Sequence, residues 1–173
     1  MTGGVGPRSL VAVSSGDSAT SKTRALAAAA LEVGGGGRLV DLLDLPADAL
    51  LGRRQDDSVD DAVAAASVAG VLVLATPVYR ATFNGAMKAF LDRFPTDALQ
   101  RTAVVLAATA GGPTHYLSLD TGGRAVVASL GGWTVPTVVY ATGAEFDDGR
   151  PSAPLLEVLR TALGQARLVA DSL

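Results

Sequence analysis

The sequence contains no cysteine and a single histidine, His115, among its 173 residues. Without cysteine the chain forms no disulfide bond and offers no thiolate as a nucleophile or metal ligand. A zinc site or a catalytic dyad would have to be built around one imidazole ring, which argues against both. We therefore expect no bound metal.

Charge and long apolar runs are also scarce. Charged residues make up 18% of the chain and the net charge is only -3, which argues against a nucleic-acid partner. No apolar run reaches the roughly 18 residues that a membrane span needs. The first seven residues are glycine-rich and lack the apolar segment of a signal peptide. We expect a flexible tail at residues 1–8 and a cytoplasmic protein with no membrane contact.

The remaining composition predicts one globular domain over residues 1–173. Apolar residues make up 49% of the chain, and its length suits one substantial core but not two. Short apolar runs alternate with helical segments, as in a doubly wound parallel sheet. The expected strands are residues 10–13, 38–42, 71–75, 102–108 and 133–140. The expected helices are residues 22–33, 59–69, 84–93, 115–130 and 154–171.

This order predicts an α/β fold of the flavodoxin-like class. It is a three-layer sandwich in which a five-stranded parallel sheet of order 2-1-3-4-5 carries helices on both faces. Ligands of such folds bind at the carboxyl ends of the strands. Three loops should therefore border one crevice, namely residues 14–23, 76–84 and 109–114.

The first of these loops carries six hydroxyl groups between a strand and a helix. A helix N-terminus attracts anions, and Ser and Thr donate to phosphate oxygens, so the loop is a candidate phosphate site. Its candidate residues are Ser14, Ser15, Ser21, Lys22 and Thr23. The simpler alternative is that Thr20 or Ser21 only caps the helix. We expect Asp17 to face solvent, because its carboxylate would repel a phosphate.

A P-loop is a further interpretation of the same segment. Residues 16–23 depart from G-x-x-x-x-G-K-[ST] only by Ser21 in place of the second glycine. The strands at residues 71–74 and 104–106 do not end in the aspartate that would help to hold magnesium, and Asp41 follows only a short run. These features weigh against a phosphotransferase.

The second loop, Ala75-Thr76-Pro77-Val78-Tyr79-Arg80, leads from a buried strand into an amphipathic helix. Pro77 should stiffen a sharp turn there, so that the backbone N–H groups of Val78 and Tyr79 can point at a flat ligand. Arg80 would add positive charge. The alternative is a plain strand-to-helix turn with a buried tyrosine. The stripe Phe83, Met87, Phe90 and Phe94 indicates core packing or a subunit interface, and in the latter case a substitution at Phe90 would disturb assembly.

The third loop, which contains Thr109, Gly111 and Gly112, would allow a ligand to approach the backbone closely. A tight turn alone would also explain the two glycines. His115 follows, either as a structural or capping residue or as a contact to a ligand ring.

These motifs together resemble the NAD(P)H-dependent FMN reductases, which are flavodoxin-like proteins. The Thr-Pro-Val-Tyr segment at residues 76–79, with its helix, is the most specific part. Residues 21–23 are similar to the family's Ser-Arg-[Ser/Thr], with Lys for Arg. Residues 115–120 with Arg124 resemble the family's His-x-Leu-x-Leu-Asp stretch and the arginine after it. The resemblance extends from Leu10 to about Tyr140.

The resemblance implies FMN as cofactor and NADPH or NADH as donor, with direct hydride transfer from nicotinamide C4 to flavin N5. No protein nucleophile or base is then required, so we assign no catalytic side chain. The hydroxyl loop would hold the phosphate, and the ring would be framed by Pro77, Val78, Tyr79, Arg80, Thr109, Gly111 and Gly112. Family members are dimers or tetramers, and many supply reduced flavin to a separate monooxygenase.

The sequence is also compatible with two other flavin functions. A flavin-dependent quinone or azo reductase would differ only in its electron acceptor. An electron carrier of the flavodoxin type is less favoured, because such carriers are strongly acidic and this chain is only mildly so.

Overall fold

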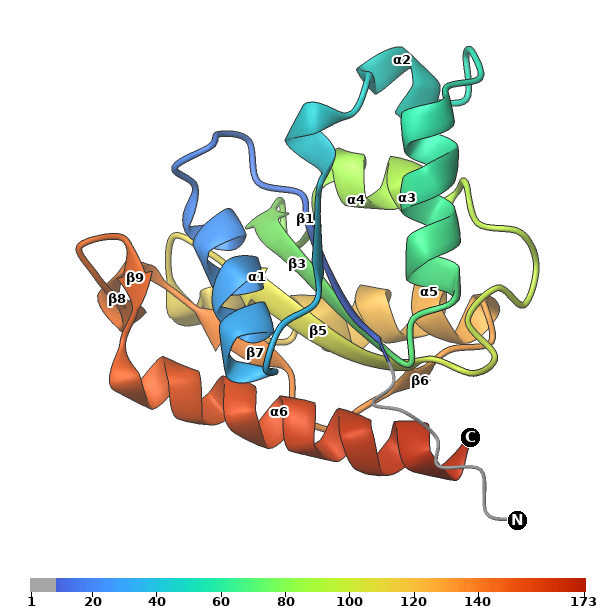
Figure 1. Ribbon diagram of the computed structural model, residues 1–173. Helices are drawn as coiled ribbons and strands as arrows, with labels where there is room; N and C mark the ends of the chain where they lie inside the picture. The colour runs from blue at the N-terminus through green and yellow to red at the C-terminus, as the bar shows by residue number, and fades with distance from the viewer. Residues whose placement is uncertain (1–8) are drawn as a thin grey trace.

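The computed structural model describes residues 9–173, so the tail expected at residues 1–8 lies outside it. A central sheet separates two layers of helices (Figure 1). Its strands are β1 (Leu10–Ser14), β2 (Arg38–Asp41), β3 (Val71–Tyr79), β4 (Thr82–Phe83), β5 (Ala103–Thr109), β6 (Trp133–Thr134) and β7 (Val139–Ala141). A separate hairpin is formed by β8 (Phe146–Asp147) and β9 (Arg150–Pro151).

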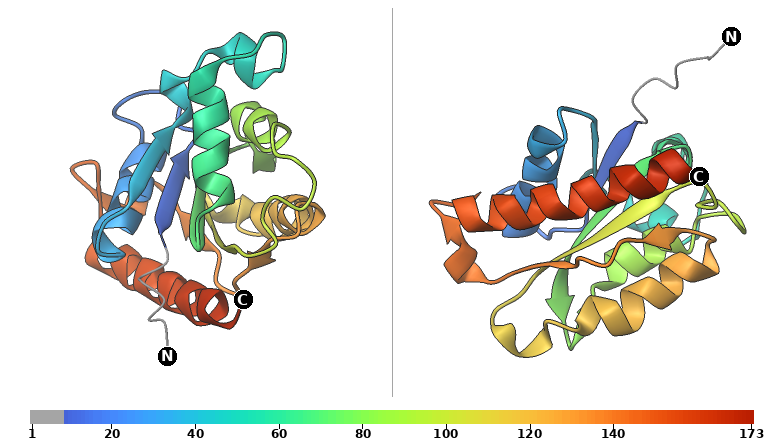
Figure 2. Two further views of the ribbon diagram at one scale, coloured as in Figure 1. Left: turned by 45° about the vertical axis from the view of Figure 1, so that its right-hand side comes forward. Right: turned by 90° about the horizontal axis from the view of Figure 1, so that it is seen from below.

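The helices cover both faces of the sheet, as expected. The α-helices are α1 (Lys22–Val33), α2 (Ala47–Leu50), α3 (Asp57–Ser67), α4 (Gly85–Leu91), α5 (Arg124–Ser129) and α6 (Ala153–Ser172). Short 3₁₀ turns are η1 (Leu42–Asp44), η2 (Pro113–His115) and η4 (Gly143–Glu145), and η3 (Leu119–Gly123) is a π-helical turn. The two views of Figure 2 show α6 running along one face and α3, α4 and α5 on the other.

The sheet order is β2-β1-β3-β5-β6, which matches the predicted flavodoxin-like class. The predicted count of five strands is wrong, because the main sheet has seven. The expected strand at residues 133–140 is interrupted around Pro136, which has no N–H to donate to a ladder. As a result β6 pairs with the start of β5 and β7 with its end. The additional strand β4 folds back on β3 in an antiparallel pair.

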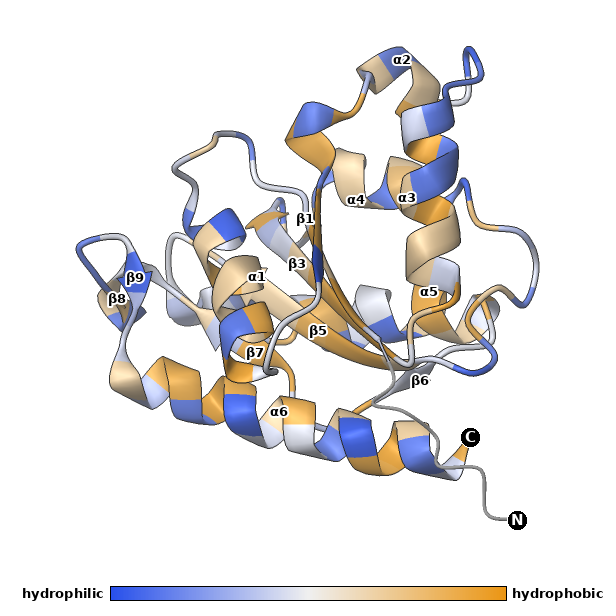
Figure 3. Ribbon diagram, in the orientation of Figure 1, coloured by the Kyte–Doolittle hydropathy of each residue, from blue (hydrophilic) through white to orange (hydrophobic). Residues whose placement is uncertain are grey.

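Alternation along the parallel strands builds two cores. In β3, Leu72 and Leu74 face α3 and α4, whereas Val71 and Val73 face α1 and α6. The same alternation continues in β1 and β5, and Figure 3 shows these strands as the most apolar part of the fold. A strand that is buried on both faces has a nearly continuous apolar sequence. The apolar runs in the sequence predicted β1, β3 and β5 for this reason.

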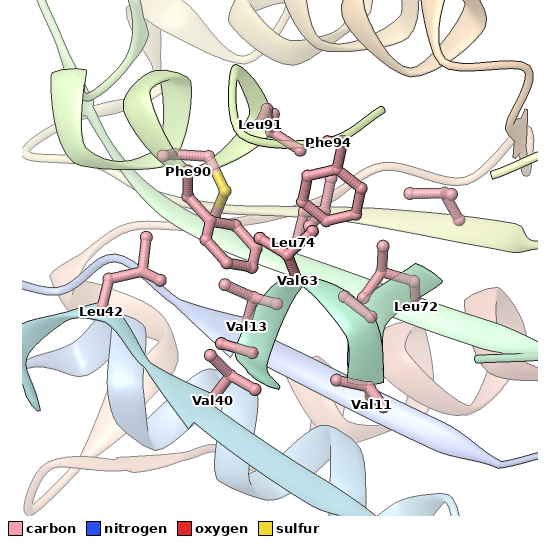
Figure 4. Packing of buried hydrophobic residues seen from close by; sticks show 14 of the residues in the cluster. Val11, Val13, Val40, Leu42, Val63, Leu72, Leu74, Phe90, Leu91 and Phe94 are labelled. Atoms are coloured by element: carbon pink, nitrogen blue, oxygen red, sulfur yellow. The ribbon is translucent and has the colours of Figure 1, made fainter. Parts of the chain in front are cut away.

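The aromatic stripe is largely core. Phe90 is fully buried, and its ring meets that of Phe94 edge to face at a centroid distance of 5.2 Å (Figure 4). Met87 is buried beside them and Phe83 is half-buried. A side chain with no exposed surface cannot contact a second subunit, so the interface interpretation is wrong for Phe90.

Two further local expectations are wrong. The chain does not turn at Pro77, since β3 continues through it and Pro77 lies opposite Thr109 of β5. The turn comes at Arg80 and Ala81, which connect β3 to β4. The single helix expected over residues 115–130 is replaced by η2, η3 and α5, and the π-helical turn contains both Gly122 and Gly123.

We predict that Phe90→Ala lowers the free energy of unfolding by about 3–5 kcal/mol, because it leaves a cavity in a closed core. Urea denaturation followed by circular dichroism would measure this. Val68→Ala, at a side chain that is 78% exposed, is the control and should change stability by less than about 0.5 kcal/mol. A Phe90→Ala protein with unchanged stability but a smaller assembly would contradict the core assignment.

Candidate functional site

The three expected loops meet at the carboxyl edge of the sheet, after β1, β3 and β5. The backbone N–H of Ser15 donates to Ala75 of β3 at 3.0 Å. The hydroxyls of Thr23 and Thr109, 86 residues apart, lie 2.6 Å from one another and are buried. These contacts tie the first loop to β3 and the start of α1 to the end of β5. We call residues 14–21, 76–84 and 109–114 the loop cluster.

A hollow of about 220 Å³ adjoins the cluster, and Ala81, Thr114, His115 and Tyr116 are among its lining residues. A larger cavity of about 750 Å³ lies at the opposite edge of the sheet, next to the glycines at residues 34–37. The chemically active residue types gather at the loop cluster. The larger cavity is lined mainly by glycine and aliphatic side chains together with Arg38, Arg167 and Asp171.

Most hydroxyls of the first loop have partners within the chain. Ser14 accepts from the N–H of Gly16, Ser15 donates to the carbonyl of Ala75, and Ser21 caps α1 by accepting from Arg24. Ser21 therefore caps α1, and Thr20 does not. Ser18 and Thr20 are exposed, and over residues 9–173 their hydroxyls have no hydrogen-bond partner. The sequence argument missed these two, although both belong to the hydroxyl-rich segment.

Lys22 begins α1, and its side chain reaches the segment between β7 and β8. Its Nζ lies 5.7 Å from the centre of the Phe146 ring, beside the β8–β9 hairpin. The segment before that hairpin is fixed by Glu145, which accepts from the N–H and hydroxyl of Thr142. The hydroxyl and backbone hydrogen bonds from Thr142 lower the pKa of Glu145. The charge of Lys22 therefore lies near the N-terminus of α1, beside Phe146 of the β8–β9 hairpin.

The second loop is an extended wall followed by a tight hairpin. Val78 is buried, and Tyr79 is 49% exposed. The hydroxyl of Tyr79 donates to Oδ2 of Asp17 at 2.8 Å, and this hydrogen bond, followed by burial and the carboxylate's charge, raises the pKa of Tyr79. Asp17 is exposed, as expected, but it is paired rather than free. The alternative of a buried tyrosine in a plain turn is wrong.

Arg80 and Ala81 form a two-residue turn with φ of 52° and 63°. Positive φ at both central positions matches the I′ hairpin turn, which favours Asn-Gly. Side-chain-bearing residues in this region cost roughly 1–2 kcal/mol each. Such strain is retained when the surrounding structure fixes the segment, and it concentrates at functional sites.

The third loop is held at one end and open at the other. Thr109 is buried against Thr23, and the hydroxyl of Tyr140 donates to the carbonyl of Gly112 at 2.5 Å. A Cβ at Gly111 or Gly112 would meet no atom within 4 Å, and neither residue has a positive φ. The turn therefore requires glycine neither for its backbone conformation nor for its packing, and the space beside both residues is open. His115 is exposed at the end of η2 and does not cap a helix.

Asn84 connects the loops and was missed as a site residue. Its amide donates to the carbonyl of Ser15 at 2.7 Å, and its Oδ1 accepts from the N–H of Met87 to cap α4. Its own N–H donates to the hydroxyl of Thr76 at 3.2 Å. An asparagine directly before a helix is a capping signal that the sequence offered. The bond to Ser15, 69 residues away, had no such signal.

The P-loop interpretation finds no support in this geometry. Asp41 accepts from Nε of Arg24 at 2.9 Å and from the N–H of Leu43, so its carboxylate is already engaged. Within residues 9–173, no group of three His, Asp or Glu side chains could hold a metal ion.

Comparison with known proteins identifies the family. The family model described as NADPH-dependent FMN reductase matches residues 9–147. The chain belongs to the NADPH-dependent FMN reductase family. It is therefore an NAD(P)H-dependent oxidoreductase that reduces FMN.

Individual relatives agree with the family. The reductase is 36% identical to an FMN reductase (NADPH) of Pseudomonas aeruginosa, over 92% of this chain and 91% of that protein. It is 35% identical to the NADH-dependent FMN reductase SfnE of Pseudomonas putida, over 87% of this chain and 85% of that protein. Among solved structures, the apo form of the NADH:FMN oxidoreductase EMOB has a TM-score of 0.85 at 35% identity, covering 93% of this chain and 89% of that one.

A more distant likeness concerns the fold alone. A flavodoxin, WrbA-like protein of Agrobacterium tumefaciens has a TM-score of 0.67 at 18% identity, covering 94% of this chain and 97% of the other. This agrees with the sheet order and supports the flavodoxin-like class.

The loop cluster has the chemistry that FMN requires. The N-terminus of α1 and the exposed hydroxyls of Ser18 and Thr20 suit a phosphate group. The open side of Gly111 and Gly112 suits the close approach of a flat ring to the backbone. Both features lie at the carboxyl edge of the sheet, where α/β folds bind their ligands.

We predict that Gly111→Ala weakens FMN binding about tenfold or more while leaving the free energy of unfolding within about 0.5 kcal/mol of the wild type. The new methyl group would meet no protein atom within 4 Å and would project into the open space where we expect the ring. Fluorescence titration with FMN and urea denaturation would measure the two quantities. Gly164→Ala, on the exposed side of α6, is the control and should raise stability by about 1 kcal/mol without changing FMN affinity. Unchanged affinity in Gly111→Ala would count against the placement of the ring.

We predict that Asn84→Asp and Asn84→Ala separate the two functions of this side chain. Aspartate still caps α4 but cannot donate to Ser15, so FMN affinity should fall with little loss of helix stability. Alanine loses both interactions, and stability should fall by a further ~1 kcal/mol. Equal FMN affinity in the wild type and Asn84→Asp would show that the Ser15 contact does not position the loop.

Proposed function

We propose that the reductase binds FMN in the loop cluster and transfers a hydride to it directly from NADH or NADPH. The observation that carries this proposal is the pair of glycines, Gly111 and Gly112, which neither backbone conformation nor packing requires. They lie beside the wall formed by Pro77, Val78 and Tyr79, on the neighbouring strand. A flat ring between the wall and the glycines would be held from both sides.

The phosphate of FMN is proposed to lie at the N-terminus of α1. Ser14, Ser15, Ser21 and Thr23 shape this loop through their hydrogen bonds, and Ser18 and Thr20 present exposed hydroxyls that have no partner among residues 9–173. Lys22 contributes positive charge at the same helix end, from the side of the β8–β9 hairpin. Arg80 contributes charge at the hairpin turn.

FMN, when bound, supplies the two-electron chemistry, so the chain needs no nucleophile of its own. The residues of the cluster bind and orient the two rings and limit the access of water. His115 and Tyr116 line the hollow beside the hairpin, where the nicotinamide could approach. Neither residue is assigned a proton-transfer role.

The reduced flavin is proposed to leave the protein for a separate monooxygenase, as the family resemblance implies. None of the helices over residues 9–173 is long and apolar enough to cross a membrane. We propose that the reductase works in the cytoplasm, where reduced nicotinamides are plentiful, as a homodimer or tetramer. Exposed apolar side chains such as Leu51 and Trp133 are available for subunit contacts.

The decisive experiment is an anaerobic titration of the FMN-loaded protein with NADH and with NADPH, followed by the visible spectrum. We expect the flavin band to bleach with one equivalent of donor, faster than free FMN with the same donor. Comparing the two donors gives the preference between them. A bound flavin that neither donor bleaches would contradict the proposal, and would favour an electron carrier.

A further inference from the structure

Asp17 and Tyr79 join the loop after β1 to the end of β3, at the edge of the sheet where we propose that the flavin binds. Asp17 belongs to the loop after β1, and Tyr79 ends β3, 62 residues later. The hydrogen bond between them lies at the surface, on top of the buried contact between Ser15 and Ala75. It is the outermost connection between the proposed phosphate loop and the proposed ring wall.

The carboxylate of Asp17 is otherwise unfavourable at this position. A negative charge in a loop that receives a phosphate reduces affinity by repulsion. Within residues 9–173 Asp17 has no cationic partner, and its side chain has one hydrogen bond, to Tyr79. A carboxylate is a strong acceptor for a phenol, and this bond turns the charge outward toward the hairpin.

The hairpin that Tyr79 begins needs to be held in place. Its turn residues Arg80 and Ala81 both have positive φ, which their side chains disfavour. On its far side, β4 packs on the π-helical turn, where a Cβ at Gly122 would lie 3.4 Å from the Phe83 ring. On its near side, two side-chain hydrogen bonds reach the loop after β1: Tyr79 donates to Asp17 at the surface, and Asn84, directly after β4, donates to the carbonyl of Ser15. Breaking the Tyr79–Asp17 bond would free the surface edge of a strained segment while the Asn84 bond stays in place.

We propose that the Asp17–Tyr79 hydrogen bond is a latch that determines how fast flavin leaves the reductase, with Asp17 as a positioning residue that acts through Tyr79. This inference rests on the proposed function. It links the exposed carboxylate to the release of reduced flavin. The bond holds the proposed phosphate loop against the proposed ring wall, and a flavin that leaves for another enzyme would leave from between them.

The test measures flavin release by stopped-flow dilution, followed by the change in flavin fluorescence. The variants are Tyr79→Phe, Asp17→Ala, the double variant and Asp17→Asn. Loss of one exposed hydrogen bond to a charged acceptor should speed release about tenfold. With riboflavin, which has no phosphate for Asp17 to repel, we expect this from each single variant and no further increase from the double variant, because both remove the same bond. Asp17→Asn retains an acceptor and should release flavin within about threefold of the wild-type rate.

Running every variant with FMN and with riboflavin separates the latch from simple charge repulsion. Riboflavin has no phosphate, so a charge effect of Asp17 would disappear with it, whereas the latch would act on both ligands. Removing a repulsive charge would also slow the release of FMN rather than speed it. Asp61→Ala, which removes an exposed side-chain hydrogen bond to Arg38 at the opposite edge of the sheet, is the matched control and should release flavin at the wild-type rate.

The latch is overturned if Tyr79→Phe releases both flavins at the wild-type rate, or if the effects of the two single variants multiply in the double variant. Acceleration that appears with FMN alone also overturns it. A wild-type protein that binds flavin and is bleached by NADH or NADPH, but whose variants release flavin normally, contradicts the latch and leaves the proposed function standing. A wild-type protein that binds no flavin contradicts both.

Discussion

The hydrogen bond from the Asn84 amide to the carbonyl of Ser15 is the interaction on which the site depends. It joins the loop after β1 to the start of α4, and the same side chain caps that helix. Since α4 carries Phe90 into the closed core, the position of the first loop is set by the packing of the hydrophobic interior. A loop tied in this way is preorganised, and a ligand then loses less free energy in ordering it.

The sequence predicted the parts of the fold that follow from strong apolar patterns. Val71 to Ala75 and Ala103 to Ala108 are buried on both faces and were recognised as strands, and α1 has the predicted bounds. Expectations failed where tertiary contacts override local preference. Pro77 does not break β3, because the strand extends past the end of β1 and pairs with β5 at that position. The β8–β9 hairpin was missed although Asp148-Gly149, with φ of 47° and 78°, is a strong hairpin signal.

The candidate site was predictable at the level of loops and less so at the level of side chains. Because α/β folds bind ligands at the carboxyl ends of their strands, the sequence predicted that residues 14–23, 76–84 and 109–114 lie together. This rule does not say which hydroxyls of a loop face the interior. Ser14 and Ser15 are buried, whereas Ser18 and Thr20 are exposed. Nor could the rule find the pairing of Asp17 with Tyr79, because a contact between side chains 62 residues apart leaves no local pattern.

The hairpins at residues 79–83 and 146–151 draw their order from different sources. Asp148-Gly149 suits its turn, so the local sequence favours the pairing of β8 with β9. Arg80-Ala81 does not suit its turn, and β4 is only two residues long, so local pairing gives this hairpin little stability. Its conformation depends instead on contacts with the rest of the fold, such as the packing of Phe83 near Gly122 of the π-helical turn. The geometry of the proposed ring wall is therefore imposed by distant parts of the chain rather than encoded in its own residues.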